Sequence, residues 1–367
     1  MTRAPRTETT YVTRKFPPSV GGMETLALNT KLALDQSYGH SSVMAMTRSN
    51  PNLLWWVPVT AVRLAVDVAR NRSASYLFGD ALAWALFSWI PRLGRRPAFT
   101  MVCGLDITYS NPIYRIPVHS ALRRASRVLA ISSATLGEAI KAGVDPARAE
   151  VLTMGVVPEK PTGTARATAR AEVRKRYGLP DDAIVMLTTG RLVERKGVRW
   201  FVDTVMPGLD TRFHYLVVGN GAQADLIRET AEKRGVADRV HLLGYVSDDD
   251  RTFLLESSDF FIQANVPVEH DMEGFGLVVV EAAQAGLLTV AAPIEGLADS
   301  VRPDVTGVTI PSGDGPAWVA GLTALADDPE RDARAERFRE AALRIFSLET
   351  MGTELERHIT EVTAAKK

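Results

Sequence analysis

One corner in the second half of the chain combines two cations with the start of a helix. The stretch from Gly190 to Gly197, GRLVERKG, follows an apolar run and opens a segment with helical spacing. Arg191 and Lys196 flank this corner, so both cations can converge on an anion at the positive end of the helix. Arginine and lysine both bind phosphate oxygens, which makes a diphosphate a fitting ligand. The alternative interpretation is a basic turn at the surface.

A second corner combines glycines with two glutamates. Glu273, Gly274, Phe275 and Gly276 precede a predicted helix that carries Glu281 within a run of valines and alanines. The glycines allow a ligand to approach the backbone closely, and the start of the helix leaves N–H groups unpaired. A carboxylate on an apolar stripe needs a partner. We expect that partner to be a ligand hydroxyl, and a salt bridge within the protein is the alternative.

Three other polar patterns are interpreted as structural. Residues 219–224, GNGAQA, have the spacing of a dinucleotide-binding loop, but the next strand ends at Gly244-Tyr245 without an acidic residue to hold a ribose. We therefore predict a tight turn. The aspartates at 248–250 are predicted to stabilise the start of a helix. The six histidines show no metal-binding spacing, so we expect no bound metal and no cofactor.

Strands and helices alternate through the second half with short links. Nearly continuous apolar runs of this kind are typical of strands buried on both faces, so we predict parallel βαβ units in a doubly wound α/β sheet. The strands are expected at 183–189, 213–218, 240–243, 260–263 and 287–292, and the helices at 196–205, 222–234, 248–256 and 276–285.

The first half is similar but less regular. Strands are predicted at 9–13, 98–102 and 127–131, and a helix at 23–34. The segment 158–168 is rich in Pro, Gly, Thr and Ala and lacks periodicity, as a linker does. We therefore place a domain boundary there, between domains at 1–160 and 161–345.

Composition and charge limit the class of protein. A single cysteine, Cys103, excludes an internal disulfide and fits a reducing compartment. Met1 to Ala4 lead into a polar stretch, and no apolar run reaches the roughly 18 residues of a spanning helix, so a soluble cytoplasmic protein is expected. The net charge of zero is a cancellation: residues 1–160 carry 19 Lys+Arg and 10 Asp+Glu, and the rest 24 and 33. We expect an anionic partner on the basic half, but no nucleic acid, with chance surface charge as the alternative.

Taken together, these residues resemble family 4 of the retaining glycosyltransferases, which have the GT-B fold. The resemblance implies two Rossmann-like domains that face each other across a cleft. It also implies metal-independent transfer of a hexose from a nucleotide-diphosphate sugar to a hydroxyl acceptor such as a glycan, glycolipid or metabolite. By this resemblance Arg191 and Lys196 hold the diphosphate, Glu273 approaches the sugar, and Glu281 approaches the ribose. The donor site is completed by Gly22, Gly190, Gly274, Phe275 and Gly276.

The first half carries further parts of the resemblance. The stretch Phe16-Pro17-Pro18 to Gly22 is similar to the family loop that reaches across the cleft. The string 104–106, GLD, is similar to a family H-G-x-D segment, although Cys103 replaces the histidine. We expect Cys103, Asp106 and Asp80 on the acceptor side, where Asp106 orients a hydroxyl or, alternatively, caps the following turn. The resemblance also implies that residues 346–367 form a helix on the first domain.

Other functions stay open. A GT-B sugar-nucleotide epimerase or phosphorylase would use the same donor corner, and a non-catalytic nucleotide-sugar sensor would bind without turnover. A peripheral place at the inner face of an anionic membrane is a further expectation, because aromatic residues alternate with arginines, with core packing as the alternative. These residues are Trp55, Trp56, Val59, Val62, Arg63, Leu64, Arg70, Trp84, Trp89, Arg92, Arg95 and Arg96.

Overall fold

The computed structural model describes residues 9–19, 21–38, 41–46, 53–70 and 72–365. The polar start of the chain, Met1 to Ala4, lies outside the described residues. The chain forms two compact units: Met1–Val157 together with Ile345–Lys367, and Pro158–Arg344. The segment predicted as a linker is irregular up to Ala165, and its last residues already belong to a helix.

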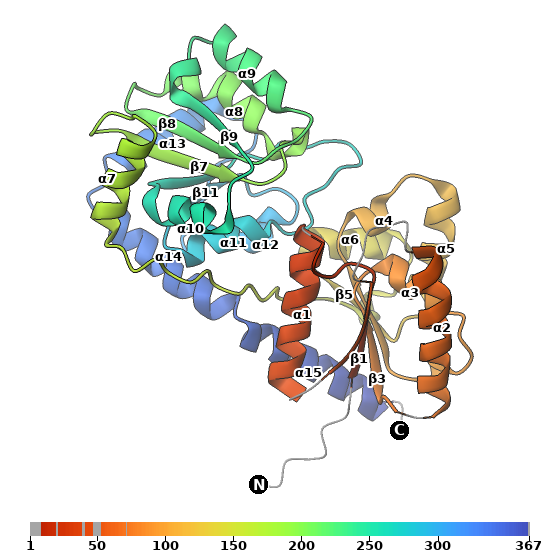
Figure 1. Cartoon of the computed structure of the whole chain (residues 1–367). Helices are drawn as coiled ribbons and strands as arrows, with labels where there is room; N and C mark the ends of the chain where they lie inside the picture. Colours follow the sequence, from red (N-terminus) through yellow and green to blue (C-terminus); the bar gives the residue numbers. More distant parts are fainter. Residues whose placement is uncertain (1–8, 20, 39–40, 47–52, 71, 366–367) are drawn as a thin grey trace. The chain divides into compact units, whose positions relative to one another are not determined.

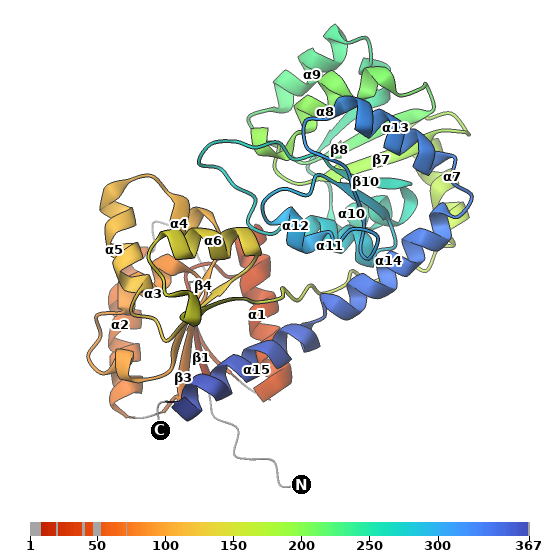
Figure 2. The same cartoon turned by 180° about the vertical axis from the view of Figure 1, so that it is seen from behind.

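The first unit contains a six-stranded parallel sheet with helices on both faces. Its strands are β1 Thr9–Thr13, β2 Ser42–Ala45, β3 Ser75–Phe78, β4 Ala98–Val102, β5 Arg127–Ala130 and β6 Ala149–Val151, in the order β2-β1-β3-β4-β5-β6. Its helices are α1 Gly22–Tyr38, α2 Leu53–Ala69, α3 Ala81–Phe87, α4 Leu105–Thr108, α5 Pro112–Leu122, α6 Ser133–Lys141 and α15 Leu348–Ala365. Within this unit, α1 and α15 lie on one side of the sheet and α2, α3 and α5 on the other (Figures 1 and 2).

The last helix, α15, packs closely against α1. A Cβ atom at Gly352 would lie 2.8 Å from the carbonyl oxygen of Ala33, so only glycine permits this approach. Arg127 of β5 also bonds to this helix, with its Nη1 atom 2.8 Å from Glu361 and 2.9 Å from His358. The end of the chain is therefore part of the first unit.

The second unit contains another six-stranded parallel sheet. Its strands are β7 Ile184–Thr189, β8 Phe213–Val218, β9 Val240–Gly244, β10 Phe260–Gln263, β11 Leu288–Ala291 and β12 Val308–Thr309, in the order β12-β11-β10-β7-β8-β9. Its helices are α7 Arg166–Arg176, α8 Val198–Thr204, α9 Ala224–Lys233, α10 Asp248–Ser257, α11 Leu277–Gln284, α12 Leu297–Ser300, α13 Gly315–Ala326 and α14 Arg331–Ile345.

Successive side chains of the central strands pack into two separate cores, one on each face of the sheet. Ile184 and Met186 of β7 pack with α8, α9, α13 and α14, whereas Val185 and Leu187 pack with α7, α10, α11 and α12. The sheet is buried on both faces, which explains why its strands are continuously apolar in sequence. The prediction of a doubly wound α/β fold, with two parallel-sheet domains, is confirmed.

Short strands are where the sequence prediction failed. It missed β2, β3, β6 and β12, which have two to four residues each. In the first unit, hydroxyl pairs allow polar residues into the sheet: Thr9 bonds Ser75 at 2.8 Å and Thr10 bonds Ser73 at 2.6 Å. Because these side chains satisfy one another, the strands there need not be continuously apolar.

The residues proposed for a membrane surface divide between core and surface. Leu64 and Trp84 are fully buried, and Trp56 packs edge-on against Phe87, so for these residues the alternative of core packing is confirmed. By contrast, Trp55 and Trp89 are exposed. No described helix is long and apolar enough to cross a membrane.

Candidate functional site

The strand order places a binding position in each unit. In an open parallel sheet, ligands bind at the carboxyl ends of two neighbouring strands whose connections run in opposite directions. In the second unit these strands are β7 and β10, and in the first they are β1 and β3. The loop Gly190–Gly197 follows β7, and Asn265 follows β10. Arg14 follows β1, and Asp80 follows β3.

Glycines allow the loops of the second unit to pack against one another. Gly197 has φ +68° and opens α8, and a Cβ there would lie 1.8 Å from the carbonyl oxygen of Ala264. A Cβ at Gly219 would likewise lie 1.8 Å from the carbonyl oxygen of Gly190. The GNGAQA loop is therefore a tight turn, as predicted, and it packs against the corner at Gly190. A Cβ at Gly190 itself would meet no described atom within 4 Å, so that side of the corner is open.

A buried ion-pair cluster joins this corner to the glutamate loop. Lys196 Nζ lies 2.7 Å from Glu273 Oε2, and Arg195 Nε lies 3.5 Å from the same oxygen. Arg195 also bonds Asp271 at 2.8 Å, and Asn265 donates to Glu273 at 3.4 Å. Burial by itself raises the pKa of Glu273, but Lys196 and Arg195 outweigh burial and hold it below its usual value. Glu273 is thus a carboxylate at neutral pH.

The cation that joins Lys196 is Arg195 rather than Arg191. Arg191 is exposed and makes no ion pair with the described residues, whereas Arg195 is almost fully buried. A 3₁₀ turn at Glu194–Lys196 aims the two adjacent side chains at one loop. Sequence reasoning missed Arg195 because its partner Asp271 lies 76 positions further along the chain.

Glu281 has a partner within the protein. It lies on α11, and its Oε2 atom is 2.9 Å from Nη1 of Arg251, which also pairs with Glu159. Burial raises the pKa of Glu281 although Arg251 opposes this. The alternative prediction, a salt bridge of Glu281 within the protein, is therefore confirmed. Its partner Arg251, on α10, is a residue that the sequence did not single out.

The rest of the glutamate loop contributes backbone. Gly276, with φ +86°, precedes α11 without a side-chain cap, and a Cβ there would lie 2.5 Å from Leu297. The Phe275 side chain is buried. The N–H of Glu273 donates to Glu295, another residue missed in sequence. Gly22 begins α1 in the first unit, where a Cβ would meet no described atom within 4 Å.

The aspartates at 248–250 occupy the first turn of α10, which Ser247 caps. Asp250 pairs with Arg176 at 2.7 Å. The structural interpretation of this acidic run is confirmed.

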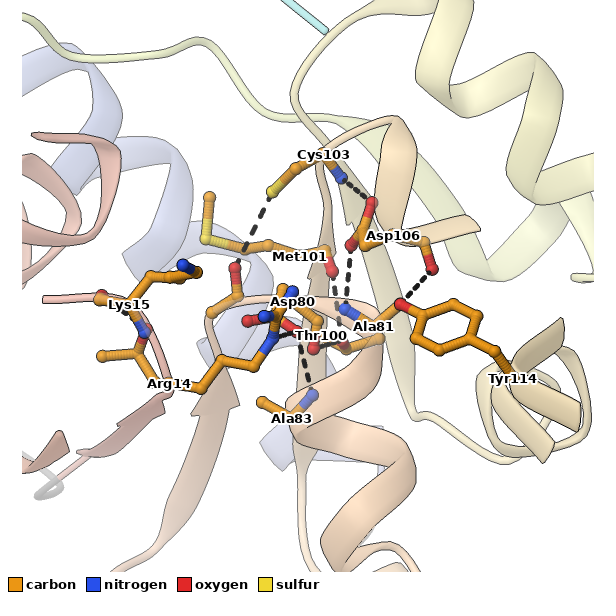
Figure 3. Close-up of polar contacts among 12 residues, drawn as sticks. Arg14, Lys15, Asp80, Ala81, Ala83, Thr100, Met101, Cys103, Asp106 and Tyr114 are labelled. Carbon is orange, nitrogen blue, oxygen red and sulfur yellow. Dashed lines mark hydrogen bonds and ion pairs between the residues drawn. The ribbon is translucent and has the colours of Figure 1, made fainter. Parts of the chain in front are cut away.

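The first unit carries its own polar cluster at the carboxyl ends of β1 and β3. Figure 3 shows Arg14 directed at Asp80, with Arg14 Nε 2.9 Å from Asp80 Oδ1. The same oxygen caps α3 by accepting from Ala83 N–H at 2.9 Å. Asp80 is completely buried, and its Oδ2 atom has no hydrogen-bond partner in the described part of the chain. Arg14 was missed in sequence, since its partner is far along the chain.

Asp106 connects two loops of this cluster. Its Oδ1 accepts from Cys103 N–H at 2.8 Å and its Oδ2 from Ala81 N–H at 2.9 Å (Figure 3). Neither bond caps the turn that follows Asp106, so the capping alternative is wrong. Burial and the nearby Asp80 raise the pKa of Asp106 to about 6. Each carboxylate oxygen is already occupied, which makes Asp106 a brace for the loops around it.

Cys103 is a protonated thiol in this environment. Its Sγ atom contacts the carbonyl oxygen of Gly79 at 3.8 Å. Burial, followed by the charges of Asp106 and Asp80, raises the pKa of the Cys103 thiol. Nucleophilic chemistry needs the thiolate, so this thiol is poorly suited to it.

Comparison with known proteins agrees with this arrangement. The family described as "Glycosyl transferases group 1" matches residues 169–344. D-inositol 3-phosphate glycosyltransferase of Salinispora tropica is 31% identical over 237 residues, which are 61% of this chain and 48% of that protein. GDP-mannose-dependent alpha-(1-6)-phosphatidylinositol monomannoside mannosyltransferase of Mycobacterium tuberculosis is 30% identical over 264 residues, which are 69% of this chain and 66% of that protein. The chain thus spans about half to two thirds of these relatives' length.

Solved structures show the same fold over nearly the whole chain. Anabaena Alr3699/HepE in complex with UDP has a TM-score of 0.75 at 18% identity and covers 96% of this chain and 100% of its own. The catalytic domain of Starch Synthase IV from Arabidopsis thaliana, bound to ADP and acarbose, has a TM-score of 0.75 at 13% identity and covers 98% of this chain and 99% of its own. The chain therefore has the GT-B fold, and its second unit matches the family of group 1 glycosyl transferases.

Proposed function

We propose that this protein is a retaining hexosyltransferase that moves a sugar from a nucleotide-diphosphate donor to an acceptor hydroxyl. The observation that carries the proposal is the buried cluster of Lys196, Arg195 and Glu273 at the carboxyl ends of β7 and β10. It combines cations for a diphosphate with an ionised carboxylate for sugar hydroxyls. UDP and UDP-glucose are bound by the similarly folded Anabaena protein, which supports a nucleotide-sugar donor.

In the proposed reaction, the bond between the anomeric carbon and the diphosphate breaks while the acceptor oxygen bonds to the same face of the sugar, and the acceptor proton passes to the leaving diphosphate oxygen. Lys196 and Arg191, with the N–H groups at the start of α11, take up the charge that builds on the leaving diphosphate. Such preorganised donors stabilise developing charge without reorganisation. These groups supply the positive charge that a metal would otherwise provide, so we propose metal-independent transfer.

The remaining donor residues position the substrate. Glu273 accepts from sugar hydroxyls, and Glu281, held by Arg251, accepts from the ribose. Gly274, Gly276 and Gly22 let the ligand approach the backbone, and Phe275 supports the loop from its buried side.

On the acceptor side we propose that Asp80 binds the incoming hydroxyl through its unpaired, buried Oδ2. Asp106 and Cys103 position this oxygen, because Asp106 fixes the N-terminus of α3, which Asp80 caps.

Donor turnover tests this proposal. We expect release of nucleoside diphosphate from UDP-, GDP- or ADP-glucose or from GDP-mannose only when an alcohol acceptor is present, at a rate that EDTA does not change. Proton NMR of the product should show the anomeric configuration of the donor. Binding without release in any acceptor screen would instead indicate a sensor. Donor conversion without a glycoside would indicate an epimerase, and a phosphate-dependent reaction a phosphorylase.

We also propose that the first unit works at the surface of an anionic membrane. Between Asp35 and Glu138 the sequence has only three acidic residues, Asp67, Asp80 and Asp106, and all are buried. The described surface of this stretch therefore carries cations but no carboxylate, which favours anionic lipid headgroups. The exposed cations include Arg63, Arg70, Arg72, Arg92, Arg95, Arg115, Arg123 and Arg124.

An apolar stripe lies within this cationic surface. Trp55, Val59, Val62 and Val66 are spaced by four, three and four residues, so they share one face of α2. All four are exposed, Trp55 by 77%. An exposed apolar stripe of this kind marks an interaction surface. The Mycobacterium tuberculosis relative is named for a phosphatidylinositol monomannoside, which also supports a lipid surface.

Replacing Trp55 with glutamate should reduce binding to phosphatidylglycerol vesicles at low salt by roughly tenfold or more. The reason is that the change removes a large apolar contact and adds repulsion from the anionic lipid. Co-sedimentation measures the bound fraction, and Leu226→Glu, an exposed site on α9 of the second unit, is the matched control. If the wild-type protein stays in the supernatant, the membrane proposal fails.

A further inference from the structure

An apolar groove lies between α3 and α5 of the first unit. Its volume is about 370 Å³, which is within the range of about 300–1,000 Å³ common for ligand sites. Its walls are Leu82, Ala85 and Leu86 on one side and Ile113, Tyr114 and Pro117 on the other. Almost all of this lining is aliphatic or aromatic, so the groove suits a hydrocarbon rather than a sugar.

The outer rim of the groove is also apolar. Ile113 is 85% exposed and Ile116, one turn further along α5, is 68% exposed. Leaving two isoleucines in water is unfavourable, and contact with an apolar partner would recover that free energy. Arg115 is also exposed on α5, and the described residues between Asp35 and Glu138 offer no exposed carboxylate. The exposed surface of α5 therefore combines apolar side chains with positive charge, as an anionic amphiphile requires.

The groove lies on the same side of the sheet as the apolar stripe of α2. Trp56 of α2 packs against Phe87 at the end of α3, with ring centroids 5.4 Å apart. Both views of the first unit show α2 and α5 on the side of the sheet that α3 occupies (Figures 1 and 2). A chain that enters the groove can thus come from the membrane surface proposed above.

The inner wall of the groove is shared with the acceptor-side cluster. The ring of Tyr114 lines the groove, and its hydroxyl donates to the carbonyl oxygen of Asp106 at 3.0 Å (Figure 3). Tyr109 packs edge-on against the same ring, with centroids 5.3 Å apart. A tail that fills the groove therefore contacts the ring whose hydroxyl bonds to the loop that carries Cys103 and Asp106.

We propose that this groove holds the aliphatic chain of the acceptor, so that the acceptor is an anionic lipid with a free hydroxyl in its headgroup. This inference rests on the proposed function, because it names the acceptor class of the same reaction. The groove binds the tail, the exposed arginines of the first unit attract the anionic headgroup, and Tyr114 connects the groove to the acceptor-side cluster.

Binding of a fatty acid tests the groove without a nucleotide or a membrane. The probe is cis-parinaric acid, a fluorescent C18 fatty acid, below its aggregation concentration and without vesicles. We expect saturable binding to the full chain and at least tenfold weaker binding to Ile113→Glu, which adds a charge at the rim. Ala85→Trp, which fills the groove, should have a similar effect.

Two control variants separate the groove from other apolar surfaces. Trp55→Glu and Leu226→Glu should bind the fatty acid like wild type, because neither residue lines the groove. Circular dichroism and melting temperature confirm that each variant is folded. Absence of saturable binding to wild type, or equal binding by both folded groove variants, would overturn the proposal.

The outcome is independent of the donor experiment. If the fatty acid binds in the groove but no nucleotide sugar is turned over, the groove stands and the proposed transfer falls. If sugar is transferred but the fatty acid does not bind, the acceptor is not a lipid held in this groove.

Discussion

Lys196→Ala is expected to weaken the binding of UDP, GDP or ADP, whichever binds to the wild-type protein, by about 10- to 150-fold. A hydrogen bond to a charged group contributes roughly 1.5–3 kcal/mol, and each 1.4 kcal/mol is a factor of ten. The expected loss lies at the upper end of that range, because Lys196 also neutralises Glu273 at 2.7 Å. Without the lysine, the buried carboxylate keeps Arg195 at 3.5 Å and repels the diphosphate.

Titration calorimetry with the three nucleotides measures this effect. Arg199→Ala is the matched control, since it removes one positive charge from an exposed position on the neighbouring helix α8. Glu281→Ala should also weaken binding, because it removes the proposed ribose acceptor and leaves Arg251 with Glu159 alone. Unchanged affinity in both Lys196→Ala and Glu281→Ala would show that the donor binds elsewhere.

Asp106→Ala is expected to lower the rate of sugar transfer at least tenfold, about 1.4 kcal/mol of transition-state stabilisation. It should also lower the free energy of unfolding by roughly 2 kcal/mol or more, because the N–H groups of Ala81 and Cys103 lose a charged acceptor. Cys103→Ser should keep most of the activity, since the thiol makes one long contact. An inactive Cys103→Ser beside an active Asp106→Ala would reverse these assignments.

The dependence of stability on pH tests whether the effect of Asp106 comes from its ionisation or from the shape of its side chain. Its pKa is about 6 in the folded protein, above the value of about 3.9 for an unfolded aspartate. The folded state therefore binds this proton more tightly, and its contribution to stability is present below about pH 4 and is lost as the pH rises through 6. Asp106→Asn removes the titration. The difference in the free energy of unfolding between wild type and this variant should therefore shrink as the pH rises from 4 to 6. A difference that is constant over this range would contradict the raised pKa.

Much of the donor side could be predicted from local sequence. Continuous apolar runs identified five of the six strands in the second unit, because strands covered on both faces have no exposed positions to interrupt the run. The same runs located the loops that carry Lys196 and Glu273, since each loop directly follows a strand or precedes a helix. Local sequence and the family resemblance together therefore singled out two side chains that the fold brings to 2.7 Å.

The partners of these side chains were decided only by tertiary structure. Arg14 and Asp80 meet because β1 and β3 are neighbours in the sheet, although 66 positions separate them in sequence. Glu281 meets Arg251 because α10 and α11 cover the same face of the second sheet. The burial of Asp67, Asp80 and Asp106, which leaves only cations on the described surface of that stretch, also follows from packing. Periodicity along a chain reports which face of an element is buried, but strand order and helix placement determine which distant side chains share that face.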